Sequence, residues 1–231
     1  MTDAARDTTA KQRHTRVVIA DDHAIVRQGL RDLISHEPDL DVCAEAATPA
    51  EALDAIARFE PEVVLLDLMF DGVSVFELLR QITSSFPNVR ILVLSMHDEL
   101  YYAERCLRAG AKGFIMKQQA PDQIVRAIRE VAEGRIHLSD QMSGKLLNVY
   151  LDGRPDAERT GIETLTDREL QVFELIGKGM TTRGIGDVPH LSIKTVETHR
   201  LNVMSKLAVS NANELIRTAA VHWVEHGREN P

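Results

Sequence analysis

The stretch PEVVLLD, residues 61–67, decides the fold, because four consecutive apolar residues run directly into Asp67. A short apolar run between polar residues is typical of a strand that is buried on both faces of a parallel sheet. Three more apolar runs end on polar residues in the same way: 17–20 before Asp21 and Asp22, 91–94 before Ser95, and 114–116 before Lys117. The four runs together predict one parallel sheet.

Helix-like segments separate these runs from Arg16 to about Glu133. The two patterns alternate five times, which indicates an α/β fold with a doubly wound, five-stranded parallel sheet. The strand-like segments are 17–20, 41–46, 63–66, 90–94 and 113–116, and the helix-like segments are 25–35, 50–59, 74–84, 99–109 and 122–133. We expect the sheet to have a flavodoxin-like arrangement.

The polar residues at the ends of the strands form a candidate site. Parallel strands that are joined by helical crossovers point the same way, so the side chains at their carboxyl ends gather at one edge of the sheet. Carboxylates suit Mg²⁺, a hard cation that proteins hold through oxygen ligands. An ammonium and a hydroxyl suit the oxygens of a phosphoryl group. The expected members are Asp21, Asp22, Asp67, Ser95 and Lys117.

Length and composition leave room for one large domain or two small ones. The chain has 231 residues and a net charge of −8, and no stretch approaches the roughly 20 apolar residues of a membrane span. Because the first 16 residues also lack an apolar core, we expect a cytoplasmic protein with no membrane contact. From Thr160 onward the chain has 8 basic and 9 acidic residues, so most of the net negative charge lies upstream of Thr160.

The C-terminal part is predicted to be a second, smaller, all-helical domain. Residues 136–162 are rich in Gly, Asp, Ser and Pro and are interpreted as a linker with a short helix at about 142–151. Thr166 and Glu169 form a capping box ahead of an apolar stripe, and Ser192 can cap a later helix. This second domain is predicted to span residues 163–227.

Both halves carry residues of a known family. The acidic pair, Asp67, Ser95 and Gly113-Phe-Ile-Met-Lys117 resemble the receiver domain of bacterial two-component response regulators, here residues 16–135. Leu165-Thr-Asp-Arg-Glu169, Gly179, Lys194-Thr-Val-Glu-Thr-His-Arg200 and Lys206-Leu207 resemble the LuxR-type helix-turn-helix. In this order the two halves are similar to the NarL/FixJ class of response regulators over nearly the whole chain.

The resemblance implies a role for each residue of the site. Asp67 would accept a phosphoryl group from a sensor histidine kinase, and Asp21 or Asp22 would hold Mg²⁺ together with Asp67. Ser95 and Phe114 would form the switch, and Lys117 would pair with the phosphoryl group. Phosphorylation adds about −1.5 to −2 charge, which is enough to bias a two-state element. The implied protein regulates transcription and is not an enzyme: its unphosphorylated receiver masks the helix-turn-helix, and phosphorylation releases it to form a homodimer on double-stranded DNA.

The helix that Ser192 caps is the expected recognition helix. Steps of 100° per residue place Val196, Val203 and Leu207 on a core-facing side, with Lys194, Glu197, Thr198, Leu201 and Ser205 opposite. Lys194 and Thr198 are placed to read base edges, whereas Thr195, Lys206 and, more weakly, Arg200 are placed for phosphates. The expected DNA-binding residues are Lys194, Thr195, Glu197, Thr198, Arg200, Leu201 and Lys206. Val221 or Trp223 would belong to a dimer contact, although Trp223 suits a core position equally well.

Two positions depart from the family pattern. Asp71 replaces a proline that most receivers have after the acceptor, and it adds a carboxylate near the site. Pro189 follows Gly184 and Gly186, so the helix before the recognition helix should be short. An alternative function is therefore a receiver-based adaptor that binds DNA weakly or not at all. A phosphatase is disfavoured because Met69 stands where such enzymes need a second carboxylate.

Overall fold

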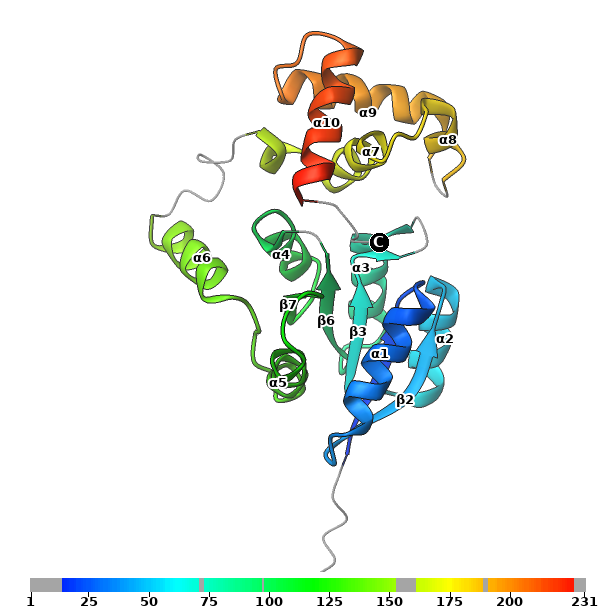
Figure 1. Cartoon of the computed structure of the whole chain (residues 1–231), viewed down its shortest axis with the longest axis vertical. Helices are drawn as coiled ribbons and strands as arrows, with labels where there is room; N and C mark the ends of the chain where they lie inside the picture. Colours follow the sequence, from blue (N-terminus) through cyan, green and yellow to red (C-terminus); the bar gives the residue numbers. More distant parts are fainter. Residues whose placement is uncertain (1–13, 71–72, 97, 153–160, 189–190, 227–231) are drawn as a thin grey trace, which may run out of the picture.

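The computed structural model describes residues 14–70, 73–96, 98–152, 161–188 and 191–226. Two parts are visible in Figure 1: an α/β part that contains the sheet, and a helical part above it at the C-terminal end. Within the described residues, no helix combines the length and the apolar character that crossing a membrane requires. Asp71 and Pro189 lie outside the described residues.

The predicted five-stranded parallel sheet is confirmed. Its strand order is β2-β1-β3-β6-β7, so β3 with Asp67 at its end is the central strand, and all neighbouring pairs are parallel. The strands are β1 (Thr15–Ala20), β2 (Leu40–Ala46), β3 (Val63–Asp67), β6 (Arg90–Ser95) and β7 (Gly113–Met116). Each differs from its predicted range by two residues or fewer.

Helices cover both faces of the sheet, which is why the strands are apolar on both sides. Alternate residues of β1 enter different cores: Val17 and Ile19 pack in one cluster, and Val18 and Ala20 in the other. The first cluster includes α1 (Ala24–Ser35) and α5 (Pro121–Ala132). The second includes α2 (Pro49–Phe59), α3 (Val75–Ser85) and α4 (Glu99–Arg108).

Two features beside the sheet were not predicted. A two-stranded antiparallel hairpin, β4 (Met69–Phe70) and β5 (Val73–Ser74), follows Asp67 directly. In addition, the chain after α5 pairs with the outer edge of β7, where the Phe114 N–H donates to the His137 carbonyl and the His137 N–H donates to the Lys112 carbonyl, both at 3.0 Å. A Cβ at Gly113 would lie 3.1 Å from the His137 carbonyl oxygen, so this close approach favours glycine.

The elements after this edge segment are all helical. The helix expected near 142–151 is present as α6 (Asp140–Asp152), and a 3₁₀ turn, η1 (Gly161–Thr164), precedes the last four helices. These are α7 (Asp167–Gly177), α8 (Thr182–Gly186), α9 (Ile193–Lys206) and α10 (Ala212–His226). The capping box of Thr166 and Glu169 is formed, Ser192 caps α9, and α8 is as short as predicted.

Candidate functional site

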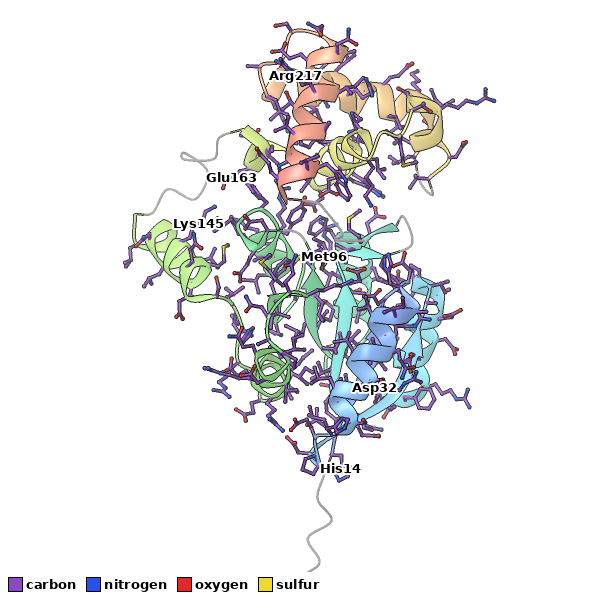
Figure 2. All side chains as sticks on the ribbon, viewed as in Figure 1. His14, Asp32, Met96, Lys145, Glu163 and Arg217 are labelled. Atoms are coloured by element: carbon purple, nitrogen blue, oxygen red, sulfur yellow. The ribbon has the colours of Figure 1, made fainter. Side chains whose placement is uncertain are left out.

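The strand ends bring the predicted acidic site together at one edge of the sheet. Asp67 ends β3, Ser95 ends β6, and Asp21 and Lys117 directly follow β1 and β7. The Lys117 Nζ lies 2.7 Å from Asp21 Oδ2 and 3.1 Å from Asp67 Oδ1. Asp21, Asp67 and Ser95 are all buried, at 4 % exposure or less. Figure 2 labels Met96, the residue after Ser95, at the end of the sheet that faces the helical domain.

Burial controls the charges of this site. It raises the pKa of the Asp67 carboxyl to about 6, although the nearby Lys117 ammonium acts in the opposite direction. For Lys117, burial favours the neutral amine, but the Asp67 and Asp21 carboxylates outweigh it and raise the pKa of the ammonium. The site therefore keeps a fixed cation beside a buried carboxylate whose charge is costly, and a metal ion bound by the carboxylates would offset that cost.

Four potential metal ligands lie close together at this site. Asp21, Asp22, His23 and Asp67 each offer one ligand atom, and these atoms lie within 4.8 Å of one another. Three carboxylates form a hard oxygen donor set of the kind that Mg²⁺ requires, so the residues present fit the expected cofactor. His23 was not predicted; its Nδ1 lies 2.9 Å from Asp22 Oδ1 and 3.3 Å from Asp21 Oδ1. Its position directly after the acidic pair was the only available signal.

The expected switch residues sit on neighbouring strands. Phe114 in β7 is 1 % exposed and packs in the same core cluster as Tyr102 of α4. Ser95 is fully buried, and its carbonyl accepts a hydrogen bond of 2.7 Å from the Lys117 N–H. The backbone thus ties the end of β6 to the lysine that contacts Asp67, and Phe114 lies buried beside it in β7.

The candidate DNA face lies on α9. Val196 and Val203 are fully buried on its inner side, as expected. On the outer side Lys194, Thr195, Glu197, Thr198 and Leu201 are exposed, whereas Arg200 is half-buried. The face is therefore accessible over its first two turns, where a recognition helix contacts base edges.

Lys206 lies in a different place from the one expected. Its Nζ lies 2.6 Å from Glu169 Oε2 and 3.1 Å from the Thr164 carbonyl, so it is bound to the beginning of α7 rather than held free for a phosphate. Helical spacing predicts only the direction in which the side chain leaves the helix, and a long flexible side chain can reach a carboxylate on a neighbouring helix. Lys206 also lowers the pKa of the Glu169 carboxyl, against the opposing effect of burial.

The two candidates for a dimer contact on α10 differ. Val221 is 50 % exposed, and Ile216 and Val224 on the same helix are exposed to a similar degree. Trp223 instead lies half-buried below the Lys178 ammonium, whose Nζ is 4.6 Å from the ring centroid. Of the two, Val221 has the accessibility that a contact with a second copy needs.

Comparison with known proteins agrees with this geometry. The family described as response regulator receiver domain matches residues 17–129, and the family described as bacterial regulatory proteins, luxR family, matches residues 163–219. The oxygen regulatory protein NreC of Staphylococcus aureus is 36% identical over 208 residues, which cover 88% of this chain and 96% of NreC. The chain is a LuxR-family two-component response regulator. It belongs to the transcription regulators and not to the enzymes.

Solved structures resemble this response regulator in the same way. A LuxR-family response regulator from Aurantimonas sp. SI85-9A1 is 33% identical, with a TM-score of 0.55 over 60% of this chain and 99% of that one. RcsB from Salmonella enterica serovar Typhimurium, solved on promoter rprA with the phosphomimetic BeF3-, has a TM-score of 0.68. That match covers 90% of this chain and 98% of RcsB at 24% identity, so it supports the fold alone.

The two domains of the response regulator contact each other through α7, which the sequence did not indicate. The Tyr102 hydroxyl of α4 donates a hydrogen bond to the buried Glu174 carboxylate of α7. Around this pair, Asp167 binds both Arg80 and Arg105, with 3.3 Å to Arg105. Additional contacts join Arg168 to Glu77 and stack Tyr101 edge-on against His222 at 5.4 Å between ring centroids.

The receiver was expected to mask the helix-turn-helix, and the structure shows which part of the helical domain it contacts. Figure 1 shows α7 between the receiver and α9, and the outer face of α9 is exposed. The receiver therefore covers α7 and not the outer face of α9. A cavity of about 40 Å³ remains in the interface, lined by Leu68 and Met69 after Asp67 and by Leu170 and Glu174 of α7 among others.

Burial in this interface changes the acidity of both members of its central pair. It raises the pKa of the Glu174 carboxyl to about 7, although the Tyr102 hydrogen bond acts in the opposite direction. Burial and the neighbouring Glu174 raise the pKa of the Tyr102 hydroxyl well above its usual value. The contact between the domains thus contains a carboxyl group that holds its proton more tightly than one in water does.

Proposed function

We propose that Asp67 is the phosphoryl acceptor of this response regulator and that a sensor histidine kinase is the donor. The observation that carries the proposal is the position of Lys117, whose Nζ contacts the carboxylates of both Asp67 and Asp21. In the reaction an Asp67 carboxylate oxygen attacks phosphorus, and the bond from phosphorus to the donor's imidazole nitrogen breaks. The product is an aspartyl phosphate and a free histidine on the kinase.

The other residues of the site stabilise the charges of this transfer. Asp21, Asp22 and Asp67 would hold Mg²⁺, which when bound neutralises the phosphoryl oxygens and orients them for in-line attack. Lys117 supplies a second positive charge at the same oxygens, and the Ser95 hydroxyl donates to one of them in the phosphorylated state. Phe114 would follow Ser95 as the second element of the switch.

We propose that the signal reaches DNA through the contact between α4 and α7. Phe114 and Tyr102 share one core cluster, and Tyr102 binds Glu174. A movement of Phe114 would therefore be transmitted to α7 through Tyr102. Release of α7 and α10 from the receiver would then allow two copies to pair through α10, with Val221 in the contact. This differs from masking because the α9 face is accessible in both states.

DNA binding would use the exposed side of α9. Lys194 and Thr198 are proposed to contact base edges, and Thr195 and Arg200 phosphates, with Glu197 and Leu201 on the same face. Lys206 is proposed as a phosphate ligand only if its ion pair with Glu169 opens. A homodimer on two half-sites of double-stranded DNA compensates for the low net charge of this helix. We propose that the protein carries out these steps in the cytoplasm.

The decisive experiment treats wild type and Asp67→Asn with acetyl phosphate and follows mass, dimerisation and DNA binding together. We expect a phosphoryl adduct, more dimer and tighter DNA binding for wild type, and none of the three for the variant. An adduct that persists in Asp67→Asn would refute the assignment of Asp67. An adduct on wild type without tighter DNA binding would refute the proposed output.

One observation favours the adaptor as a second candidate. With Lys206 paired to Glu169, the positive charges that α9 can offer to DNA are Lys194 and Arg200, against Glu197. Non-specific attraction to DNA depends on such charges and falls steeply with salt. If the phosphorylated full-length protein fails to bind DNA even at low salt, the adaptor function replaces the transcriptional one.

A further inference from the structure

Arg27 of α1 holds the loop that carries the acidic pair. Its Nη1 donates a hydrogen bond of 2.7 Å to the Asp21 carbonyl, and its own backbone N–H donates to the His23 carbonyl at 3.1 Å. The side chain is 17% exposed, and Glu45 of β2 lies 3.6 Å from its Nε. The Arg27 side chain therefore binds the beginning of the segment from Asp21 to His23, and its backbone makes the first helical bond at the end of that segment.

The segment from Asp21 to His23 is the part of the acidic site that regular secondary structure does not hold in place. Asp67 is held within a strand, and the Asp21 N–H is tied to the Ala46 carbonyl at 3.1 Å, but Asp22 is exposed and belongs to no strand or helix. Its carboxylate lies close to two others of the same charge. Fixing the Asp21 carbonyl fixes the peptide plane that leads to Asp22, and so the direction from which its carboxylate enters the site.

We infer that Arg27 is a positioning residue for the metal-binding carboxylates. The inference rests on the proposed function, because it assumes that these carboxylates hold Mg²⁺. Outer-shell groups that orient ligands commonly change metal affinity by about 10- to 100-fold when they are removed. Arg27 does not touch the reacting atoms; its hydrogen bond goes to the backbone of a ligand.

The sign of the effect separates positioning from charge. Arg27 is a cation near a cation site, so its charge alone opposes Mg²⁺, and removing only the charge tightens Mg²⁺ binding. Removing the hydrogen bond loosens the loop and weakens Mg²⁺ binding. A net loss of affinity in Arg27→Ala therefore means that positioning outweighs charge.

Arg31 provides a matched control on the same helix. It lies one turn further along α1, and its Nη1 is 2.6 Å from the other oxygen of Glu45. Its remaining contact is with the Gln28 side chain, so its partners lie outside the acidic loop. Arg31→Ala removes the same charge and a bond to the same Glu45 but leaves the Asp21 carbonyl bonded.

The test measures Mg²⁺ binding to the full-length protein by calorimetry, with thermal unfolding in the absence of Mg²⁺ to establish that each variant is folded. We expect Arg27→Ala to weaken binding by at least about tenfold, Arg31→Ala by less than about twofold, and Arg27→Lys to recover part of the loss. Saturating Mg²⁺ should restore most of the phosphorylation rate of Arg27→Ala with acetyl phosphate, since the reacting groups remain.

Several results would overturn the inference. Arg27→Ala that binds Mg²⁺ as well as wild type, or better, shows that the hydrogen bond does not position the site. An equal loss in Arg31→Ala shows an effect of charge or of Glu45 only. If Arg27→Ala does not fold, Arg27→Lys decides. A geometric role is contradicted when folded Arg27→Lys and folded Arg31→Ala both bind Mg²⁺ with wild-type affinity. Failure of wild type itself to bind Mg²⁺ overturns the proposed metal site and this inference with it.

Discussion

The acidic edge of the receiver and the outer face of α9 are organised in opposite ways. Asp21 and Asp67 are buried, and the half-buried Lys117 contacts both of their carboxylates. In contrast, the candidate DNA face of α9 consists of exposed side chains, among them Lys194 and Leu201, the latter 66% exposed. A buried cluster of charges is arranged before its ligand arrives, whereas an exposed face is ordered by the ligand itself. Substitutions should therefore cost more at the receiver site than on α9.

The largest effect is expected at Lys117. Lys117→Ala removes the cation that contacts both buried carboxylates and would stabilise the transferred phosphoryl group. Removing one such preorganised donor typically costs about 10²- to 10³-fold in rate. The rate of phosphorylation by acetyl phosphate at saturating Mg²⁺ measures this loss. A loss below about threefold would remove the contrast with α9.

The next effect concerns the contact between the domains and its pH dependence. The pKa of the Glu174 carboxyl is raised to about 7 in the packed state, so this state binds the proton more tightly than the separated state does. The protonated Glu174 carboxyl therefore stabilises the packed state fully below the usual carboxyl pKa near 4.5, and this stabilisation is lost as pH rises through about 7. Since one pKa unit is about 1.4 kcal/mol, the contribution is at most about 3 kcal/mol.

Small-angle scattering at pH 6 and pH 8 measures this separation of the domains. Wild type should be more compact at pH 6, and Glu174→Gln, which imitates the protonated carboxyl, should change less between the two values. Asp67 is present in both proteins and titrates in the same pH range. The quantity to compare is therefore the difference between the pH responses of wild type and Glu174→Gln. The groups around Glu174 are Tyr102, Lys178 and Arg105. The same pH response in both proteins would contradict the prediction.

A smaller effect is expected on the recognition helix. Lys194→Ala should weaken specific DNA binding by about 1–3 kcal/mol if the residue contacts a base edge. Lys206→Ala should leave DNA affinity nearly unchanged, because its ammonium is bound to Glu169 and Thr164. Titration of a fluorescent operator at two salt concentrations distinguishes them. A large, salt-dependent loss in Lys206→Ala would show that its ion pair opens on DNA.

The smallest effect tests how the helical domain itself is held. Thr166 caps α7 within a capping box, and Thr166→Ala should cost about 1 kcal/mol of unfolding free energy. Chemical denaturation followed by circular dichroism measures it. Phosphorylation of Asp67 should be unaffected, since the receiver site and this cap belong to different domains. A matching loss in the phosphorylation rate would mean that the two domains depend on each other more strongly than the contacts suggest.

Much of the receiver could be predicted because its signals are local. A run such as Val63–Asp67 is apolar up to the aspartate that ends it, and a parallel strand places that aspartate at a defined edge of the sheet. The hairpin of β4 and β5 was missed because two-residue strands leave no periodicity to read. His137 was missed for a different reason: its bonds to β7 involve only backbone groups, which every residue carries.

The sequence by itself determined which elements form and which polar residues lie at the ends of the strands, because apolar periodicity and capping are properties of neighbouring residues. Only the tertiary structure decided which side chains meet across elements. Lys206 turns to Glu169, Arg27 binds the Asp21 carbonyl, and Tyr102 meets Glu174 across the domains. These contacts depend on how helices pack and how far long side chains reach, and neither is encoded in local spacing.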